Sequence, residues 1–375
     1  MHVLTVLGTR PEAIKLAPVV RAFGQRSDVR HTLCVTGQHR QMLDQMLAAF
    51  YLKPDHDLAV MRRGQDPAHV TMAVLGGLGT VIEAERPDWI VVQGDTATAF
   101  AASLAAFYRK VKVAHVEAGL RTGNIYSPWP EEMNRKLTGQ IATLHFPPTD
   151  AAAANLAREG VPPERILVTG NTVIDALHAI AARLDATAAL RGQLDAGFAW
   201  RDPGKRLILV TGHRRENCEG GLERVCRALA AIGRRGDVQI VCPVHLNPAV
   251  QRTVRSVLRG SPSVHLIAPL DYLPFVHLMR QASIIVTDSG GIQEEAAGLG
   301  KPVLVTRDTT ERPEAVAAGA ARLVGTDEAA LIDAAAALLD DPAAYDAMTR
   351  AANPFGDGRA ANRIVARMLM EERTA

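Results

Sequence analysis

The chain has 375 residues, 47% of them apolar, and its 42 basic and 40 acidic residues leave a formal net charge of +2. This length accommodates two domains of ordinary size. The balanced charge argues against the broad basic surface of a nucleic-acid or membrane-surface binder, and no apolar stretch is long enough to span a membrane.

The cysteine and histidine spacings add a second set of exclusions. The four cysteines show no CxxC pair, and the twelve histidines show no HExxH or paired-ligand spacing, so a structural metal is not expected. The first residues enter a strand-like run directly, without a signal-peptide pattern. We therefore expect a cytoplasmic protein with reduced thiols.

Apolar runs of strand length alternate with helix-like stretches along the chain. The first series of predicted strands is Val3–Leu7, Thr32–Val35, Trp89–Val92, Val113–Val116, Leu144–Phe146 and Ile166–Val168. Helical patterns between them include Ala13–Phe23, Arg40–Phe50, Ala68–Ala84 and Thr98–Tyr108. Alternation of this kind predicts a parallel sheet with helices on both faces.

A second series begins after a long helix and a polar turn at residues 201–205. Its predicted strands are Leu207–Val210, Val238–Val241, Val264–Ile267, Ser283–Val286 and Val303–Val305, and a final helix spans Ala360–Glu371. We predict an α/β protein of two doubly wound domains that meet near residues 168–175, with ligands at the carboxyl ends of the strands.

The segment Thr287-Asp288-Ser289-Gly290-Gly291-Ile292-Gln293-Glu294-Glu295 is the most informative motif. It joins a buried strand to a helix, so backbone N–H groups and the helix dipole converge on a point that suits a phosphate. Glu295 follows one turn later, where its carboxylate can hold a ribose diol. The alternative is an ordinary strand-to-helix turn with a cap.

The first strand leads into Gly8-Thr9-Arg10-Pro11-Glu12, where Thr9 and Glu12 have capping-box spacing. Arg10 and Lys15 are cations near a helix N-terminus, which opposes the helix dipole and indicates a nearby anion, unless both are solvated surface cations. The motif lacks the GxGxxG glycines, so bound NAD is not expected.

Three acidic residues follow strands or open a helix where the sheet meets the predicted cleft. Asp95 follows the third strand, Glu117 the fourth, and Glu131 stands in Pro128-Trp129-Pro130-Glu131-Glu132. Converging carboxyl groups push their pKa values apart, which separates acid from base roles. The alternatives are a loop cap for Asp95, an ion pair with Arg121 for Glu117, and helix N-terminal stabilisation for Glu131.

Two further motifs follow strands of the second series. Gly212-His213-Arg214-Arg215-Glu216-Asn217 places three positively chargeable groups after a strand, so His213 is a candidate general acid or phosphate ligand, unless the segment is a solvated basic turn. The segment 307–314 places Arg312 before a proline-started helix.

These motifs together resemble the non-hydrolysing bacterial UDP-N-acetylglucosamine 2-epimerases. The matching segments, in order, are 8–12, 115–121, 212–217, 288–295, 307–314 and Asn353-Pro354-Phe355-Gly356-Asp357-Gly358. The resemblance implies a GT-B fold of two Rossmann-like domains, residues 1–170 and 171–357, with a C-terminal helix, 358–372, packing back on the first. It also implies a homodimer, with no cofactor and no metal.

The activity that the resemblance implies is reversible C2 epimerisation of UDP-GlcNAc to UDP-ManNAc, for cell-envelope polysaccharides. The C2 proton is not next to a carbonyl, so the family is thought to eliminate UDP, forming 2-acetamidoglucal, and to add it back after reprotonation on the other face. The residues that match catalytic positions are Asp95, Glu117, Glu131 and His213; which acid removes the proton stays open. Those that match substrate contacts are Arg10, Lys15, Arg135, Arg214, Leu270, Phe275, Ser289, Gly290, Gly291, Glu295 and Arg312.

Many bacterial members also bind UDP-GlcNAc at a regulatory site beside the active site. The residues that match or neighbour that site are Gln38, Gln41, Gln65, Glu131, Arg135 and His245. Gly64 replaces an arginine that some members have there, which argues against strong activation. Glu219 replaces a glycine of many members and adds a negative charge near the diphosphate.

Three other functions would use the same binding residues. A hydrolysing epimerase would release ManNAc and UDP, a GT-B glycosyltransferase would need an acceptor cleft, and a nucleotide-sugar sensor would not require three acids. The acid constellation favours the epimerase.

Overall fold

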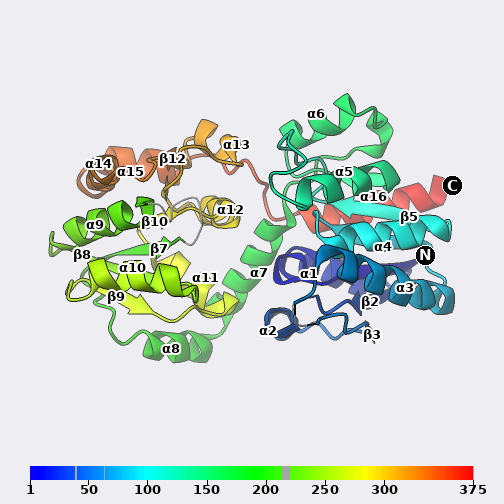
Figure 1. The fold of residues 1–375 in the computed structure, drawn as a ribbon, viewed down its shortest axis with the longest axis horizontal. Helices are drawn as coiled ribbons and strands as arrows, with labels where there is room; N and C mark the ends of the chain where they lie inside the picture. Colours follow the sequence, from blue (N-terminus) through cyan, green and yellow to red (C-terminus); the bar gives the residue numbers. More distant parts are fainter. Residues whose placement is uncertain (39, 63, 213–219, 375) are drawn as a thin grey trace. The chain divides into compact units, whose positions relative to one another are not determined.

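The computed structural model describes residues 1–38, 40–62, 64–212 and 220–374. The chain divides into two compact units, one formed by Met1–His178 with Phe355–Ala375 and the other by Ala179–Pro354. Each contains a parallel sheet with helices packed around it (Figure 1).

The sheet of the first unit has the strand order β3-β2-β1-β4-β5-β6 among the described residues, and every pair is parallel. The central strands are apolar and fully buried, because helices cover both faces of such a sheet. The strands are β1 (His2–Leu7), β2 (Arg30–Val35), β3 (His56–Asp57), β4 (Trp89–Gln93), β5 (Lys112–Val116) and β6 (Leu144–Phe146).

Three helices of this unit, α3, α4 and α6, begin at residues whose side chains cap the first backbone amides. Asp66, Thr96 and Thr149 each accept a backbone N–H three residues ahead. The helices are α1 (Arg10–Gly24), α2 (Arg40–Ala49), α3 (Pro67–Glu85), α4 (Ala97–Tyr108), α5 (Glu131–Ile141), α6 (Asp150–Arg158), the 3₁₀ turn Pro163–Arg165, and α7 (Thr172–Ala186), which runs into the second unit.

The last helix, α16 (Ala360–Thr374), belongs to the first unit and packs against α1. The Asp175 carboxylate of α7 accepts the N–H groups of Ala360 and Ala361, which begin α16. Near its other end, Glu372 accepts the Trp89 indole N–H at 2.9 Å and pairs with Lys112 at 3.1 Å. Both ends of α16 are therefore fastened to the first unit.

The second unit repeats the same strand order, β12-β11-β10-β7-β8-β9. Its strands are β7 (Arg206–Thr211), β8 (Val238–Pro243), β9 (Val264–Ile267), β10 (Ile284–Thr287), β11 (Val303–Val305) and β12 (Ala321–Leu323). Its helices are α8 (Ala188–Gly197), α9 (Gly221–Gly233), α10 (Pro248–Leu258), α11 (Tyr272–Gln281), α12 (Gly290–Gly298), α13 (Pro313–Ala317), α14 (Glu328–Asp340) and α15 (Pro342–Thr349).

The α/β class and the strand predictions are confirmed, with one exception. Residues 166–168 do not form a strand: Ile166 makes a single bridge with His145, because the chain leaves a 3₁₀ turn at Arg165 and enters α7 at Thr172. The sequence did not predict two strands, β3 and β12. Both are edge strands, of two and three residues, and are too short to show a periodic pattern.

The capping box predicted at the start of α1 is wrong. The Thr9 side chain makes no capping hydrogen bond, although Thr9 is the N-cap residue. The buried Glu12 carboxylate instead accepts the Gly8 N–H at 3.0 Å and the Thr96 hydroxyl at 2.7 Å. Glu12 thereby ties the loop after β1 to the loop after β4.

Neither a membrane-spanning helix nor a metal-binding cluster is found in the part of the chain that the structure describes. No described helix is both long and apolar enough to cross a bilayer. No group of three or more His, Cys, Asp or Glu side chains is arranged to hold a metal ion among those residues.

Candidate active site

In both sheets the strand order runs outward in opposite directions from two central strands. Open α/β sheets of this kind bind ligands at the point between those two strands. In such sheets the crevice lies outside the carboxyl ends of the two central strands. In the first unit these strands are β1 and β4, which lead to Gly8–Arg10 and to Asp95. In the second unit they are β7 and β10, which lead to Gly212 and to Asp288–Gly290. The motif residues therefore mark the ligand-binding edge of each sheet.

Asp95 is held by two residues of α5. The Arg135 guanidinium forms an ion pair with the Asp95 carboxylate, and the Asn134 side-chain amide donates to the Asp95 carbonyl oxygen at 3.0 Å. Arg135 also pairs with the fully buried Glu132 at 3.3 Å. The sequence placed Asp95 and Arg135 among the site residues, and the structure brings them into contact.

The surroundings of Asp95 favour its protonated form. Burial raises the pKa of its carboxyl above the ordinary value, the Arg135 charge opposes that rise, and the nearby Glu117 charge adds to it. A carboxyl group with a raised pKa beside a second carboxylate is suited to take up and release a proton.

Glu117 follows β5 in an unusual backbone conformation. Its φ is +58°, in the left-handed region that a non-glycine residue seldom adopts, and such residues cluster at functional sites. Its carboxylate forms an ion pair with Lys15 of α1 and accepts the Asn171 side-chain N–H at 3.0 Å. Two of the predicted site residues, Lys15 and Glu117, therefore meet.

The alternative interpretation of Glu117, an ion pair with Arg121, is wrong. Residues 117–121 form a turn rather than a helix, and the Arg121 guanidinium instead binds both oxygens of Glu159, at 2.8 and 2.7 Å. The carboxylate of Glu117 is directed toward the Lys15 side of the strand end instead.

Glu131 and Arg10 stand at helix starts. Glu131 is the first residue of α5 and is half-buried, a place that also fits its alternative role of stabilising the helix N-terminus. Arg10 is the first residue of α1, half-buried, and directly follows the strand end that carries Gly8.

Several residues that support this site were not singled out from the sequence. Glu132 is fully buried and accepts the N–H groups of Thr122 and Gly123 at 3.1 Å, so it anchors the loop after β5. His115 donates to the Gly94 carbonyl at 2.8 Å, and burial lowers its pKa to about 3, so the ring is neutral. The sequence shows the adjacent acids Glu131 and Glu132, but it does not indicate which of the two side chains is buried.

In the second unit, the predicted phosphate-binding turn lies at the start of α12. Ser289 is the N-cap, and its N–H donates to the Thr287 hydroxyl at 3.0 Å. A Cβ added to Gly290 would lie 3.8 Å from Arg312 Cζ, so the Arg312 guanidinium is beside the helix start. Arg312 forms an ion pair with the buried Glu294. Gly291, next along α12, is exposed.

Glu295 lies inside the first turns of α12 and is held by Tyr272. The Tyr272 hydroxyl donates to Glu295 Oε1 at 2.8 Å, and both side chains are buried. Phe275, from the same helix as Tyr272, is also buried, whereas Leu270 just before that helix is half-buried. The carboxylate and the predicted apolar wall thus come from neighbouring elements.

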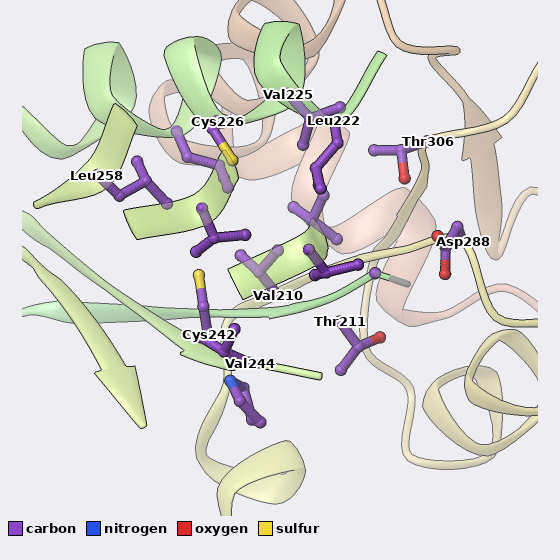
Figure 2. Close-up of a pocket in the computed structure, with 16 residues that line it drawn as sticks. Val210, Thr211, Leu222, Val225, Cys226, Cys242, Val244, Leu258, Asp288 and Thr306 are labelled. Atoms are coloured by element: carbon purple, nitrogen blue, oxygen red, sulfur yellow. The ribbon is translucent and has the colours of Figure 1, made fainter. Parts of the chain in front are cut away.

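A small cavity lies under the same edge of the second sheet (Figure 2). Leu258 and Cys226 line one end, and Asp288 and Thr306 lie at the other. Its volume of about 40 Å³ holds water molecules but not a nucleotide base.

The predicted regulatory residues are divided between the units. In the first unit, Gln38 accepts the Thr98 hydroxyl at 2.9 Å through its side chain and the Gln65 amide at 2.9 Å through its carbonyl, so Gln38 and Gln65 are in contact. Gln41 is exposed on α2, and Gly64 is an exposed turn residue with φ +72°. His245, in the second unit, is exposed, and its ring accepts the Asn247 N–H at 3.1 Å.

The predictions for His213, Arg214 and Glu219 lie outside the described residues. Chemically, the described part of the site offers two coupled carboxyl groups with fixed cationic partners in one unit. The other unit offers a helix N-terminus beside an arginine and a buried carboxylate. The carboxyl groups of the first unit are suited to proton transfer, and the helix N-terminus of the second is suited to an anionic group.

Comparison with known proteins covers nearly the whole chain. The family model for UDP-N-acetylglucosamine 2-epimerase matches residues 21–369. A UDP-N-acetylglucosamine 2-epimerase of Yersinia pestis is 57% identical over 366 residues, which are 97% of this chain and 97% of that protein.

Solved structures agree with the sequence comparison. The UDP-GlcNAc 2-epimerase of Neisseria meningitidis, bound to UDP-GlcNAc, is 46% identical with a TM-score of 0.91 and covers 99% of this chain and 100% of its own. The Methanocaldococcus jannaschii UDP-GlcNAc 2-epimerase, in complex with UDP-GlcNAc and UDP, is 34% identical with a TM-score of 0.81, at 99% and 100% coverage. The likeness spans both units and confirms the predicted GT-B fold.

Proposed function

Because the chain belongs to the UDP-N-acetylglucosamine 2-epimerase family, we propose that it interconverts UDP-GlcNAc and UDP-ManNAc by eliminating and re-adding UDP. The observation that carries this proposal is the pairing of Asp95 with Arg135 and of Glu117 with Lys15 at one strand edge. Two electrostatically coupled carboxyl groups with separate cationic partners are what a two-sided proton exchange at one carbon requires.

The proposed chemistry proceeds through an elimination. A carboxylate removes the C2 proton, the C1–O bond breaks, the electron pair left at C2 forms the C1–C2 double bond, and UDP departs with the bonding electrons. Reversal with the proton delivered to the opposite face gives the epimer. The step is feasible only if the developing negative charge on the diphosphate is stabilised.

The described residues divide these tasks between them. Asp95, Glu117 and Glu131 are the proposed proton carriers, and the raised pKa of Asp95 supports its inclusion. Arg10 and the start of α12 at Ser289–Gly291, with Arg312 beside it, are proposed to bind the diphosphate. Glu295 is proposed to bind the ribose, and Leu270 and Phe275 the uracil. His213 and Arg214 complete the proposal as leaving-group contacts.

Proton NMR of UDP-GlcNAc with the purified protein in D₂O tests the function. We expect UDP-ManNAc to form, with deuterium at C2 of both sugars, because each passage through the intermediate exchanges that proton. Free ManNAc with UDP would instead indicate a hydrolysing epimerase. Unchanged UDP-GlcNAc that still binds would contradict both and leave a glycosyltransferase or a sensor.

We also propose that UDP-GlcNAc acts at a regulatory site near Gln38, Gln41, Gln65, Arg135 and His245. The contact between Gln38 and Gln65 supports this, because it links the α2 region to Thr98 behind the site. The proposal predicts that added UDP-GlcNAc accelerates the reverse reaction from UDP-ManNAc, only weakly because Gly64 supplies no cation.

A homodimer in the cytoplasm completes the proposal. The exposed apolar side chains of Met72 on α3 and of Phe107 and Tyr108 at the end of α4, two helices that pack together, support a subunit interface. The three described cysteines are buried free thiols, which suits a reducing compartment. Light scattering during gel filtration tests the dimer.

We also propose that the two predicted domains, residues 1–170 and 171–357, are the functional halves of the protein.

A further inference from the structure

Asn171 contacts Glu117 although it lies far from it in the sequence. Its side-chain N–H donates to Glu117 Oε2 at 3.0 Å, while its side-chain oxygen accepts the Val173 N–H at 3.1 Å. Asn171 is buried, with 2% of its surface exposed. The Asn171 side chain therefore caps helix α7 through its oxygen and holds the Glu117 carboxylate through its N–H. Because both ends of the amide have partners, these two hydrogen bonds fix its orientation.

The backbone around Asn171 is fixed by the chain that returns to the first unit. The Asn171 N–H donates to the Phe355 carbonyl at 2.6 Å, and Phe355 is buried. A Cβ added to Gly170 would lie 3.0 Å from Gly356 Cα, so the two glycines pack closely. Gly170, Asn171, Phe355 and Gly356 all belong to the first unit, so the segment that begins α7 and the segment that returns to this unit at Phe355 are held together at Asn171.

Glu117 needs such a partner because of its own geometry. Its backbone has φ +58°, and its ion pair with Lys15 involves an ammonium, a point charge on a flexible stem that sets no unique direction. The planar amide of Asn171 does set a direction, since a hydrogen bond weakens steeply away from linearity. The orientation of Glu117 therefore depends on Asn171.

From this geometry we infer that Asn171 is a positioning residue for the epimerisation, which fixes the Glu117 carboxylate and links its orientation to the chain segment at Phe355. The inference rests on the proposed function, because it takes Glu117 to exchange a proton with the substrate. Asn171 does not titrate, so it aligns Glu117 without changing the charge of the site.

Two substitutions separate positioning from capping. Serine and aspartate are both good N-cap residues, so Asn171→Ser and Asn171→Asp preserve the start of α7. Serine is too short to reach Glu117, and we expect kcat to fall about 10- to 100-fold with KM changed less than about threefold. Aspartate places a second carboxylate against Glu117, and we expect the kcat/KM profile against pH to shift upward by about one unit or more.

The charged and titratable groups near Glu117 must be held constant in this comparison. Among the described residues they include Lys15 from α1, Asp95 after β4 with its partner Arg135 from α5, and the neutral His115 from β5. Neither substitution touches them. Asp175→Asn is the matched control, because Asp175 lies on the same helix but its carboxylate accepts the N–H groups of Ala360 and Ala361, which begin α16.

The outcomes decide between three possibilities. Loss of kcat in Asn171→Ser, a shifted profile in Asn171→Asp, and a lower melting temperature with an unshifted profile in Asp175→Asn support the inference. Native kcat in Asn171→Ser, or losses that follow the folded fraction with no shift in Asn171→Asp, overturn it. Glu117→Gln is measured alongside: if that variant keeps native turnover, the proposed role of Glu117 fails, and the inference fails with it for a distinguishable reason.

Discussion

The two carboxyl groups at the strand edge of the first unit are held by different means. Asp95 pairs with the Arg135 guanidinium, which also pairs with the buried Glu132. Glu117 pairs with the Lys15 ammonium and accepts a hydrogen bond from the neutral amide of Asn171. Both groups influence each other, because the Glu117 charge raises the pKa of Asp95. Replacing one of them therefore changes the proton affinity of the other as well as removing one proton carrier.

We expect Asp95→Asn to lower kcat at least about 100-fold, because it removes one positioned proton carrier and leaves Arg135 without its anionic partner. UDP affinity should change less than about threefold, since the diphosphate contacts proposed at α12 belong to the other unit. Initial rates by NMR and titration calorimetry with UDP measure both quantities. Asp150→Asn, an exposed carboxylate in the first turn of α6, is the control. Native turnover in Asp95→Asn would exclude Asp95 from the chemistry.

Tyr272→Phe tests the proposed ribose contact. The change removes the 2.8 Å hydrogen bond to Glu295 and leaves that buried carboxylate with one donor fewer, so its position relaxes. We expect UDP to bind about 5- to 20-fold more weakly, which corresponds to about 1 to 2 kcal/mol for a bond to a charged group. Calorimetry with UDP measures it. Tyr345→Phe, a half-buried tyrosine of α15 in the same unit, should bind UDP normally. Equal affinity in both variants would mean that Glu295 does not bind the nucleotide.

The sequence indicated which residues lie at the strand ends of the first unit, but it did not indicate which of their side chains contact one another. Motif spacing placed Asp95, Glu117, Arg135 and Lys15 correctly near strand ends, because a parallel sheet brings those ends to one edge. It did not predict that Lys15 binds Glu117, since that contact depends on how α1 packs against the sheet. Asn171 was missed for the same reason: its partner is more than fifty positions away and nothing local marks it.

At the scale of elements, prediction succeeded where the apolar pattern was long. Strands such as β1 and β4 are continuous buried apolar runs, which a sequence pattern reveals. The failures are short and at edges: β3 and β12, and the single bridge at Ile166. An edge strand is defined by its neighbour's hydrogen bonds rather than by its own side chains, so its residues carry little signal.

The C-terminal helix α16 offers a test of how the last residues support the first unit. Ile364 is fully buried, and Ile364→Ala should lower the free energy of unfolding of that unit by about 2–4 kcal/mol through lost burial and a cavity. Met370, on the same helix, is 63% exposed, and Met370→Ala should change the free energy of unfolding by less than about 0.5 kcal/mol. Urea denaturation followed by fluorescence measures both. Equal effects would mean that α16 is not docked through its apolar face.

At the scale of the whole molecule, folding withdraws several histidine rings of the first unit from water, and three of them have strongly lowered pKa values. Burial lowers the pKa of His115 to about 3 and those of His31 and His145 to about 4, from an ordinary value of 6.5. The unfolded chain therefore binds more protons than the folded one between those values, so stability is fully present above pH 6.5 and is lost as pH falls toward 4.

Three buried carboxyl groups act in the opposite direction. Burial raises the pKa of Glu12, Asp95 and Asp175, so the fold binds their protons more readily and gains stability as the pH falls. We expect the histidine contribution to the free energy of unfolding to fall between pH 7 and 5, because the unfolded histidines take up protons there and the folded ones do not. Urea denaturation at several pH values measures this slope. His115→Gln keeps a donor for the Gly94 carbonyl but cannot titrate, and it should flatten the slope, whereas His69→Gln at the half-buried start of α3 should not. An unchanged slope in His115→Gln would show that ring burial does not set the acid sensitivity of the fold.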